Sequence, residues 1–274
     1  MSQTKNFMDW DNPGTAFITG ASSGLGAVFA RELASQKFNV VLVARRKERL
    51  DKLASELEEQ YDINAQVLTA DLSKFDDIER LYDDITKIDD IDILINNAGF
   101  GTLGYFDNTP FGPQREMLFV HNVAPVYFCR AALPIMIKRG RGSIINVSSV
   151  SAFIQMPQSV MYTSTKVFLK EFTENLNLEL EDTGVKVQAL CPGFTISEFH
   201  DAEYFKEFDI TTIPDNAWMP AEEVVKLSLA AVPEGNVVFI PGEPYQAFVK
   251  LITNPKLGRR TLRNMRKAAK LPRN

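Results

Sequence analysis

The sequence predicts a single-domain α/β fold in which helices cover both faces of a parallel, doubly wound sheet. Three observations support this prediction. Short β-branched apolar runs alternate with amphipathic stretches along the whole chain, a spacing typical of strand–helix–strand units. Several of these runs have no polar side, as expected for strands covered by helices on both faces. The 274 residues show no internal repeat, low-complexity segment or linker, which favours one domain.

Seven segments have the length and composition of strands. They are 15–19, 39–44, 65–69, 91–96, 143–147, 185–190 and 236–240. Six further segments carry apolar residues at helical spacing. They are 25–36, 47–61, 76–87, 114–138, 160–181 and 221–231. We therefore expect an N-terminal extension (1–14), a dinucleotide-binding catalytic domain (15–243) with a lid at about 194–219, and a basic helical appendage (244–274).

Composition and charge exclude several classes of protein. Apolar residues make up 45% of the chain and charged residues 24%, as in a globular protein with a sizeable core. No uninterrupted apolar run approaches membrane-spanning length, and the polar residues 1–6 lack the apolar core of a signal peptide, so we expect a cytoplasmic protein. The net charge is −5, but nine basic and no acidic residues lie in 250–274, which leaves −14 on the remainder. This acidic body argues against nucleic acid as a partner.

Cysteine and histidine are too sparse for a disulfide or a metal site. Cys129 and Cys191 lie within apolar helix and strand patterns, where cysteine is a small buried hydrophobe. Only His121 and His200 are present, without clustered ligands at metal-binding spacing. We therefore expect no metal.

The turn after the first strand has the composition of a phosphate-binding loop. Glycine lets the chain turn sharply and lets a pyrophosphate approach the backbone N–H groups at the start of the next helix. Glycine also ends strands for steric reasons alone, but the strand–turn–helix position favours dinucleotide binding. The predicted contacts are Gly20, Ser22, Ser23, Gly24, Leu25 and Gly26.

Arg45 and Arg46 follow the second strand, where a carboxylate would bind the ribose 2′-hydroxyl of NAD. Two guanidinium groups instead suit the 2′-phosphate of NADP. We therefore expect NADP(H) in preference to NAD(H). The alternative is that both arginines are solvent-exposed loop residues that bind no ligand.

The ends of the third and fourth strands complete the predicted cofactor cleft, because ligands of such sheets bind outside the carboxyl ends of the strands. Asp71, followed by Leu72, is placed to contact an adenine edge. Asn97, Ala98 and Gly99 end the fourth strand and are expected to let the backbone lie against the cofactor.

Tyr162 and Lys166 lie four residues apart in a predicted helix and therefore share a face. Free tyrosine titrates far above neutral pH, but a neighbouring positive charge favours phenolate and lowers the pKa. Such a tyrosine can act as a general acid or base. A tyrosine and a lysine at this spacing are also common surface neighbours. The presence of Asn122 and of the serines at 148 and 149 favours the catalytic interpretation.

These segments together resemble the single-domain short-chain dehydrogenase/reductase family. The motifs that match are Thr19-Gly-x-x-x-Gly-x-Gly26, Asn96-Asn-Ala-Gly99, Asn122, Ser149, Tyr162-x-x-x-Lys166 and Cys191-Pro-Gly193. The resemblance extends over about 15–240. It implies a Rossmann-like fold and hydride transfer between a nicotinamide cofactor and a carbonyl or alcohol.

By this resemblance, the catalytic residues are Asn122, Ser149, Tyr162 and Lys166. The serine of the family lies thirteen residues before the tyrosine, which selects Ser149 over Ser148. Ser149 would hold the substrate oxygen and Tyr162 would exchange a proton with it. Lys166 would lower the tyrosine pKa and bind the nicotinamide ribose. Asn122 would kink its helix and anchor a water.

The family also implies nicotinamide contacts at Pro192, Gly193 and Thr195. Ser197 stands where the family usually has a threonine, so this role is divided between Thr195 and Ser197. Ala152 replaces a frequent glycine, which bears on the shape of the loop and not on the chemistry.

The predicted substrate side is aromatic. In the family, the segment that corresponds to 194–219 closes over the substrate, and long loops in compact domains are typically functional. Phe199 is the predicted substrate contact on this segment, together with Ser149 and Tyr162. The expected rim of the pocket is Phe100, Leu103, Phe153, Ile154 and Met156. Such a rim favours a bulky apolar carbonyl or alcohol, although aromatic residues could equally serve to attach the lid.

The basic tail has two interpretations: a helix on an anionic membrane surface, or a helix docked on the acidic body or a neighbouring subunit. Its thin apolar line favours docking. The resemblance implies a homodimer or homotetramer built on the helices at 114–138 and 160–181. We expect an NADP-preferring oxidoreductase of ketones, aldehydes or alcohols. The alternatives are a hydroxysteroid or other polycyclic-alcohol dehydrogenase, and a cofactor-sensing regulatory protein on the same fold.

Overall fold

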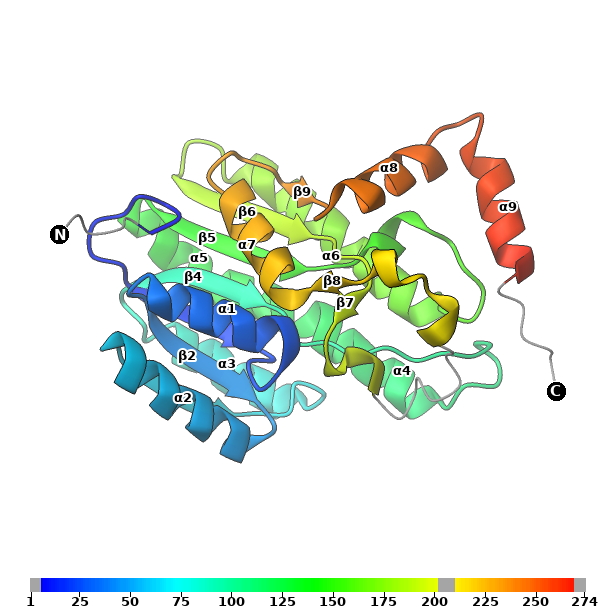
Figure 1. Ribbon diagram of the computed structural model, residues 1–274. Helices are drawn as coiled ribbons and strands as arrows, with labels where there is room; N and C mark the ends of the chain where they lie inside the picture. The colour runs from blue at the N-terminus through cyan, green and yellow to red at the C-terminus, as the bar shows by residue number, and fades with distance from the viewer. Residues whose placement is uncertain (1–5, 202–209, 269–274) are drawn as a thin grey trace.

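The computed structural model describes residues 6–201 and 210–268. Seven parallel strands form one sheet in the order β3-β2-β1-β4-β5-β6-β9 (Figure 1). The strands are β1 (Thr15–Thr19), β2 (Asn39–Ala44), β3 (Ala65–Thr69), β4 (Ile91–Asn96), β5 (Gly142–Val147), β6 (Val185–Leu190) and β9 (Val238–Phe239). The order reverses between β1 and β4, as in a doubly wound fold. The predicted α/β class with a seven-stranded parallel sheet is confirmed.

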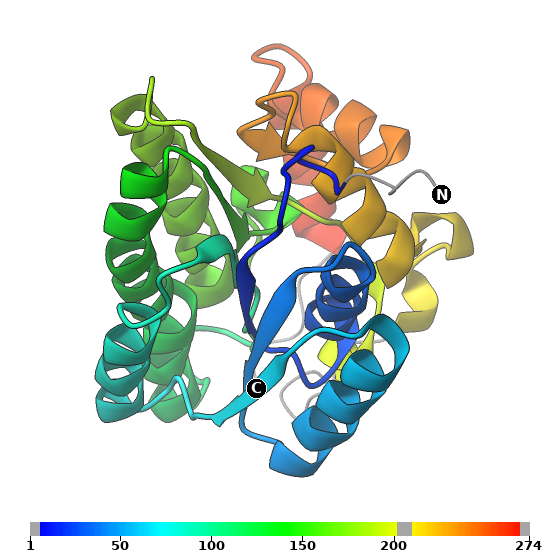
Figure 2. The ribbon, with the colours of Figure 1, turned by 90° about the vertical axis from the view of Figure 1, so that its left-hand side faces the viewer.

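Helices cover the sheet on both faces (Figure 2). One layer contains α1 (Gly24–Ser35), α2 (Lys47–Tyr61) and α7 (Ala221–Ala231). The other contains α3 (Phe75–Ile85), α5 (Ala124–Arg139) and α6 (Val160–Glu179). Because both faces are covered, β1, β4 and β5 are buried along their whole length, which explains their continuous apolar composition.

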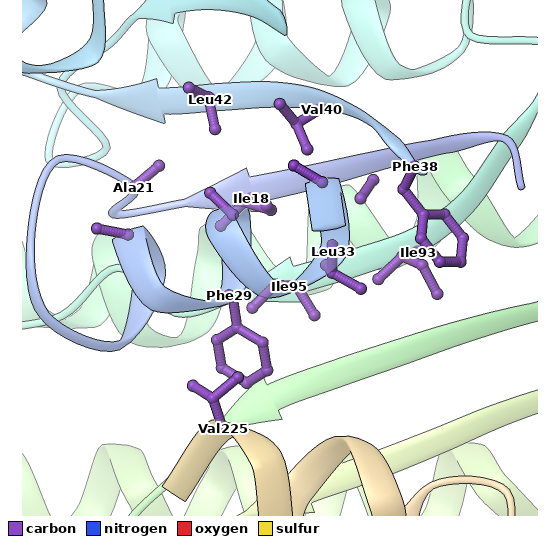
Figure 3. Packing of buried hydrophobic residues seen from close by; sticks show 14 of the residues in the cluster. Ile18, Ala21, Phe29, Leu33, Phe38, Val40, Leu42, Ile93, Ile95 and Val225 are labelled. Atoms are coloured by element: carbon purple, nitrogen blue, oxygen red, sulfur yellow. The ribbon is translucent and has the colours of Figure 1, made fainter. Parts of the chain in front are cut away.

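Apolar residues at helical spacing attach α1 to the sheet. Phe29 and Leu33 lie four residues apart and are fully buried against the sheet. Figure 3 shows Phe29 directed toward Val225 of α7, while Leu33 lies beside Ile93 and Ile95 of β4. Each such side chain contributes about 1.5–3 kcal/mol through burial. This packing fixes α1, and therefore the glycine turn before it.

The long helix predicted at 114–138 differs from the structure in its start and its regularity. It begins three residues earlier, at Phe111, because Pro113 in the first turn needs no intrahelical N–H bond. It then runs as α4 (Phe111–Leu118), a π-helical turn η1 (Phe119–Val123) and α5. Such π turns insert a residue into a helix and are frequent at functional sites. Asn122 lies in this turn.

The same helical run satisfies the length and composition of a membrane span. Residues Phe111–Arg139 form 29 helical residues with a mean hydropathy of 1.2 in the most apolar window, of which 44% is buried inside the protein. The sequence had predicted no such segment. Because α5 packs on β4, β5 and α3, this composition is accounted for by its place in the core.

The C-terminal part also differs in detail from the prediction. Strand β9 is shorter than the predicted 236–240, since only Val238 and Phe239 pair with β6. The appendage forms two helices, α8 (Glu243–Ile252) and α9 (Gly258–Ala268). Helix α9 packs on α8 at the margin of the molecule (Figure 1). Residues 1–5, 202–209 and 269–274, which include parts of the predicted extension, lid and tail, lie outside the described residues.

A buried ionic cluster lies at the amino ends of the strands. Asp92 of β4 is 0% exposed and pairs with Arg139 at 2.9 Å and with Arg141 at 2.7 Å. The Asp92 carboxylate also accepts the N–H of Gly14 at 2.8 Å. The cluster therefore ties the chain before β1 to β4 and to the connection between α5 and β5.

Candidate active site

A cleft of ≈ 840 Å³ opens at the carboxyl ends of the strands, where the reversal of strand order leaves a crevice in doubly wound sheets. Most of the predicted site residues line this cleft. They are Gly20, Ser22, Ser23, Gly24, Leu25, Arg45, Arg46, Asp71, Leu72, Asn97, Ala98, Gly99, Ser149, Tyr162, Lys166, Pro192, Gly193, Thr195 and Phe199. Gly26 and Asn122 are buried outside the lining.

The glycine turn is held against the loop after β4. Gly20 has a φ of +69°, and a Cβ atom there would lie 2.6 Å from Asn97 Nδ2, so only glycine is accommodated. The Thr19 hydroxyl accepts the N–H groups of Asn97 and Ala98, each at 3.0 Å. The resulting cradle of backbone at the start of α1 fits the pyrophosphate of a dinucleotide.

Arg46 is fixed to the glycine turn. Its guanidinium donates to the Ser22 hydroxyl at 2.9 Å and to the Ser23 hydroxyl at 2.7 Å. It also pairs with Glu198 at 2.8 Å, and Arg49 pairs with the same carboxylate at 2.6 Å. These two arginines hold the pKa of Glu198 below its usual range.

Sequence reasoning missed Arg49 and Glu198. Arg49 lies one helical turn after Arg46, so the helix at 47–61 could have identified it. Glu198 lies 152 residues from Arg46 in the chain and had no local signal. Arg45, which was predicted on equal terms with Arg46, lines the same cleft.

On the side of the cleft expected to hold adenine, hydrogen bonds to neighbouring residues fix the loop that carries Asp71. The Asp71 carboxylate accepts the Ser73 N–H at 3.1 Å, and the Asp71 N–H donates to Asp77 at 2.9 Å. Leu72 beside it is buried. An acidic side chain and an apolar surface therefore face the cleft next to β3.

The two adjacent serines face different ways. The Ser148 hydroxyl donates to the Lys166 carbonyl at 2.8 Å and so attaches β5 to α6. Both serines line the cleft, and Ser149 is the one whose side chain influences the pKa of the Tyr162 hydroxyl. The Ser149 hydroxyl also accepts the Ser151 N–H at 3.1 Å. Of the pair, Ser149 is therefore the one that can reach a ligand.

Lys166 is buried beside Tyr162, and its ammonium lies 5.7 Å from the centre of the tyrosine ring. It donates to the Val147 carbonyl at the end of β5, at 2.8 Å. Burial lowers the pKa of Lys166 to about 8, because desolvation disfavours the charged form.

The direction of the Tyr162 pKa differs from the sequence prediction. We expected Lys166 to lower it, but burial raises the pKa of Tyr162 to about 12, against a smaller lowering by the Ser149 hydrogen bond. Desolvation disfavours the phenolate more than the contact with Ser149 favours it. In this structure, Tyr162 is therefore a phenol at neutral pH.

His121 is a third residue that sequence reasoning missed. Its Nε2 atom accepts the Phe100 N–H at 3.1 Å, and its Nδ1 atom lies 2.9 Å from the Thr165 hydroxyl. Since Thr165 donates its own proton to the Tyr162 carbonyl, His121 Nδ1 carries the proton toward Thr165. Burial and Lys166 hold the pKa of His121 well below its ordinary value, so this neutral ring is a fixed support.

Asn122 joins the same two helices. Its side-chain amide donates to the Thr165 carbonyl at 3.0 Å, and it lies in the predicted kink, which is the π turn η1. It connects that turn to α6, which carries Tyr162 and Lys166.

The substrate side is only partly as predicted. The ring of Phe199 lies 5.9 Å from that of Tyr162, and Phe100 and Leu103 line the cleft. Phe153, Ile154 and Met156 are absent from the lining. Phe153 instead lies beneath the ammonium of Lys170 at 5.7 Å. Phe153 ends the short 3₁₀ helix Val150–Phe153 that follows Ser149.

Tyr245 of α8 supports the base of the predicted lid. Its hydroxyl accepts the Phe194 N–H at 2.9 Å and donates to the Ala217 carbonyl at 2.7 Å. These partners flank the two short strands Thr195–Ile196 and Met219–Pro220, which pair with each other. A Cβ atom at Gly193 would overlap the tyrosine ring. Part of the predicted appendage therefore supports Gly193 and Phe194, which line the cleft.

No group of three or more His, Cys, Asp or Glu side chains within the described ranges is arranged to hold a metal ion. Cys129 and Cys191 are free and buried, and burial raises the pKa of each thiol to about 12.

Comparisons with known proteins agree with this geometry. The family model of short chain dehydrogenases matches residues 14–206. The very-long-chain 3-oxoacyl-CoA reductase of Anas platyrhynchos is 31% identical over 67% of this chain and 60% of that protein. The 11-beta-hydroxysteroid dehydrogenase 1A of Arabidopsis thaliana is 36% identical over 69% of this chain and 54% of that protein. The match thus spans less than two thirds of the length of these curated relatives.

Two solved structures are similar over nearly the whole chain. The bulky-bulky ketone specific alcohol dehydrogenase from Comamonas testosteroni is 31% identical, with a TM-score of 0.76 over 96% of this chain and 98% of that one. A short-chain dehydrogenase from Sphingobium yanoikuyae in complex with NADPH is 30% identical, with a TM-score of 0.78 over 95% and 98%. The chain therefore belongs to the short-chain dehydrogenase/reductase family, oxidoreductases that act on carbonyl and alcohol groups.

Proposed function

We propose that this protein reduces a bulky apolar ketone to a secondary alcohol with NADPH. The observation that carries the proposal is that Ser149, Tyr162 and Lys166 line the same cleft as the glycine turn, with the Lys166 ammonium 5.7 Å from the centre of the Tyr162 ring. The chemistry that NADPH supplies when bound is hydride donation to the carbonyl carbon.

The chain supplies the proton and the orientation. Ser149 and Tyr162 donate hydrogen bonds to the carbonyl oxygen and stabilise the negative charge that develops there. Tyr162 then transfers its proton to this oxygen as a general acid. Lys166 places a positive charge behind the phenol and stabilises the phenolate that remains.

The raised pKa of Tyr162 favours the direction of reduction. A phenol with a pKa of about 12 is protonated at neutral pH, which is the form that a general acid requires. Alcohol oxidation would require the phenolate, which is scarce under these conditions. This direction agrees with the use of NADPH as the donor.

The preference for NADP(H) over NAD(H) rests on charge. Arg46 contacts the serines of the glycine turn, and Arg49 lines the same cleft and shares Glu198 with it. Both follow β2, on the side of the cleft where the adenosine ribose of a dinucleotide binds. Two guanidinium groups suit a 2′-phosphate. The NADPH complex of the Sphingobium relative supports this assignment.

The apolar side of the cleft supports a bulky substrate. Phe199, Phe100 and Leu103 line the cleft around Tyr162, and apolar walls with few polar groups bind bulky apolar ligands. The ketone specificity named for the Comamonas relative points the same way. Steroid ketones belong in the test, because a relative at 36% identity is named as a hydroxysteroid dehydrogenase.

The proposal is tested by following NADPH and NADH consumption with pooled bulky ketones, aldehydes and steroids. We expect consumption of NADPH with bulky ketones, slower consumption of NADH, and loss of activity in Ser149→Ala. Binding of NADPH without turnover of any carbonyl would instead support a cofactor-sensing protein.

We also propose that the chain forms a homodimer or homotetramer through α4, α5 and α6. Large apolar side chains are exposed on these helices, among them Phe111, Leu118, Ile137, Phe168 and Leu178. Exposed large apolar side chains gathered on a few helices favour an interface between subunits. Sedimentation at equilibrium, with Phe168→Lys as the variant, tests it: we expect a smaller particle for the variant.

A further inference from the structure

We propose that Glu198 determines cofactor specificity by competing with the 2′-phosphate of NADP(H) for Arg46 and Arg49. The inference rests on the proposed preference for NADP(H) and adds a residue that acts against it. Glu198 follows the short strand β7 (Thr195–Ile196) and lies far in sequence from both arginines.

The geometry is that of an anion held between two cations. One Glu198 oxygen lies 2.8 Å from Arg46 and 2.8 Å from Arg49, and the other lies 2.6 Å from Arg49. Carboxylate and phosphate oxygens are recognised by guanidinium groups in the same way. Glu198 therefore occupies the partners that a 2′-phosphate needs.

Arg46 does not depend on Glu198 for its position. Its Nε and Nη2 atoms donate to the Ser22 hydroxyl, and Nη2 also donates to Ser23. The guanidinium thus stays at the glycine turn when the carboxylate leaves. Glu198 therefore controls only two groups: the Nη1 donor of Arg46 and the guanidinium of Arg49. Both become available to a 2′-phosphate when the carboxylate leaves.

The contact is exposed enough to exchange. The side chains of Arg46, Arg49 and Glu198 are 43%, 50% and 46% exposed. Ion pairs in such positions are weak, because water solvates the separated charges well. A phosphate carries more charge than a carboxylate, so NADP(H) displaces Glu198 but loses part of its binding free energy in doing so. NAD(H) has no 2′-phosphate and leaves the contact intact.

The competition can be measured without turnover. Adenosine 2′,5′-bisphosphate and adenosine 5′-monophosphate differ only in the 2′-phosphate, and their dissociation constants can be compared by calorimetry. We expect Glu198→Gln to bind the bisphosphate about fivefold more tightly, the equivalent of one or two exposed ion pairs, and the monophosphate unchanged. Far-ultraviolet circular dichroism verifies that the variant is folded.

Two further variants sharpen the test. Glu116→Gln removes the same charge from another residue that lines the cleft, and it should leave the preference for the bisphosphate unchanged. In an Arg49→Ala background, Glu198→Gln should have a smaller effect, because one of the two contested partners is gone.

Three results would overturn the inference. The first is unchanged or weaker binding of the bisphosphate by Glu198→Gln while the unaltered protein prefers it over the monophosphate; this leaves the NADP(H) proposal intact. The second is an equal gain in Glu116→Gln, which would reveal a general charge effect. The third is no preference of the unaltered protein for the bisphosphate, which would remove the cofactor proposal and the inference together.

Discussion

The two ends of the sheet contain the same ionic arrangement in opposite surroundings. At the amino ends of the strands, one carboxylate, Asp92, contacts Arg139 and Arg141. At the carboxyl ends, one carboxylate, Glu198, contacts Arg46 and Arg49. The Asp92 side chain is 0% exposed and that of Glu198 is 46% exposed. The difference in burial favours a structural role for the first cluster and leaves the second accessible to the ligand proposed above.

The partners of each cluster support this assignment. Asp92 also accepts a backbone N–H from Gly14, and Arg141 donates to the carbonyls of Asp11 and Asn12. Removing a partner from a buried ion pair leaves an uncompensated charge, which is strongly destabilising. Around Glu198 water can replace the lost contacts. The polar groups around Glu198 are thus available to a ligand, while those around Asp92 are engaged with one another.

The largest effect outside the catalytic residues is expected for Asp92→Asn. This variant leaves two guanidinium groups without their carboxylate and should lower the free energy of unfolding by about 3 kcal/mol. Urea denaturation measures the change. Glu198→Gln is the matched control at the other end and should lose less than about 1 kcal/mol. Similar losses in both variants would contradict the comparison.

The pH dependence tests the titratable groups at the carboxyl ends. Since the pKa of Tyr162 is raised to about 12, the phenolate fraction rises about tenfold per pH unit below that value. The kcat/KM of alcohol oxidation should rise accordingly up to about pH 8, above which Lys166 loses its charge. Ketone reduction should stay flat over the same range. A plateau of oxidation below neutral pH would mean that the bound cofactor lowers the tyrosine pKa, as the sequence predicted.

Arg49→Ala sharpens the assignment of the exposed cluster. It should weaken the binding of NADPH about tenfold, the effect of losing one charge-assisted contact to phosphate, and leave NADH binding nearly unchanged. Fluorescence titration of each cofactor measures this. Arg31→Ala, which breaks an exposed pair with Glu56, is the control and should affect neither. Equal weakening of both cofactors by Arg49→Ala would argue against a 2′-phosphate site.

The smallest effect is expected for Tyr245→Phe. Loss of the hydroxyl leaves the Phe194 N–H and the Ala217 carbonyl without this partner, at a cost of about 1 kcal/mol in stability. Because these groups flank the base of the predicted lid, the KM for ketone should rise while kcat changes less. Steady-state kinetics separate the two. An unchanged KM would show that Tyr245 of α8 contributes to stability and not to the binding of the ketone.

The sequence predicted the fold well because its signals are local. Continuous apolar strands such as β4 and the glycine turn before α1 follow from composition and spacing. Boundaries were less certain where pairing is short, as at β9. The early start of α4 depends on Pro113 being tolerated in a first turn.

The site was predicted only where local motifs mark it. Tyr162 and Lys166 share a helical face, and the resemblance indicated Ser149. Glu198, Tyr245 and His121 were missed, because their partners are distant in sequence. The sign of the Tyr162 pKa shift could not be predicted, because burial of the phenol, its largest cause, is a property of the folded cleft.

The central claim is that Tyr162 delivers the proton to a carbonyl held at the mouth of this cleft. The most direct measurement is a single turnover of bound NADPH with a bulky ketone, in the unaltered protein and in Tyr162→Phe. We expect the variant to bind NADPH normally and to oxidise it about a thousandfold more slowly, within the range for loss of a general acid. Oxidation at the unaltered rate in the variant would contradict the claim.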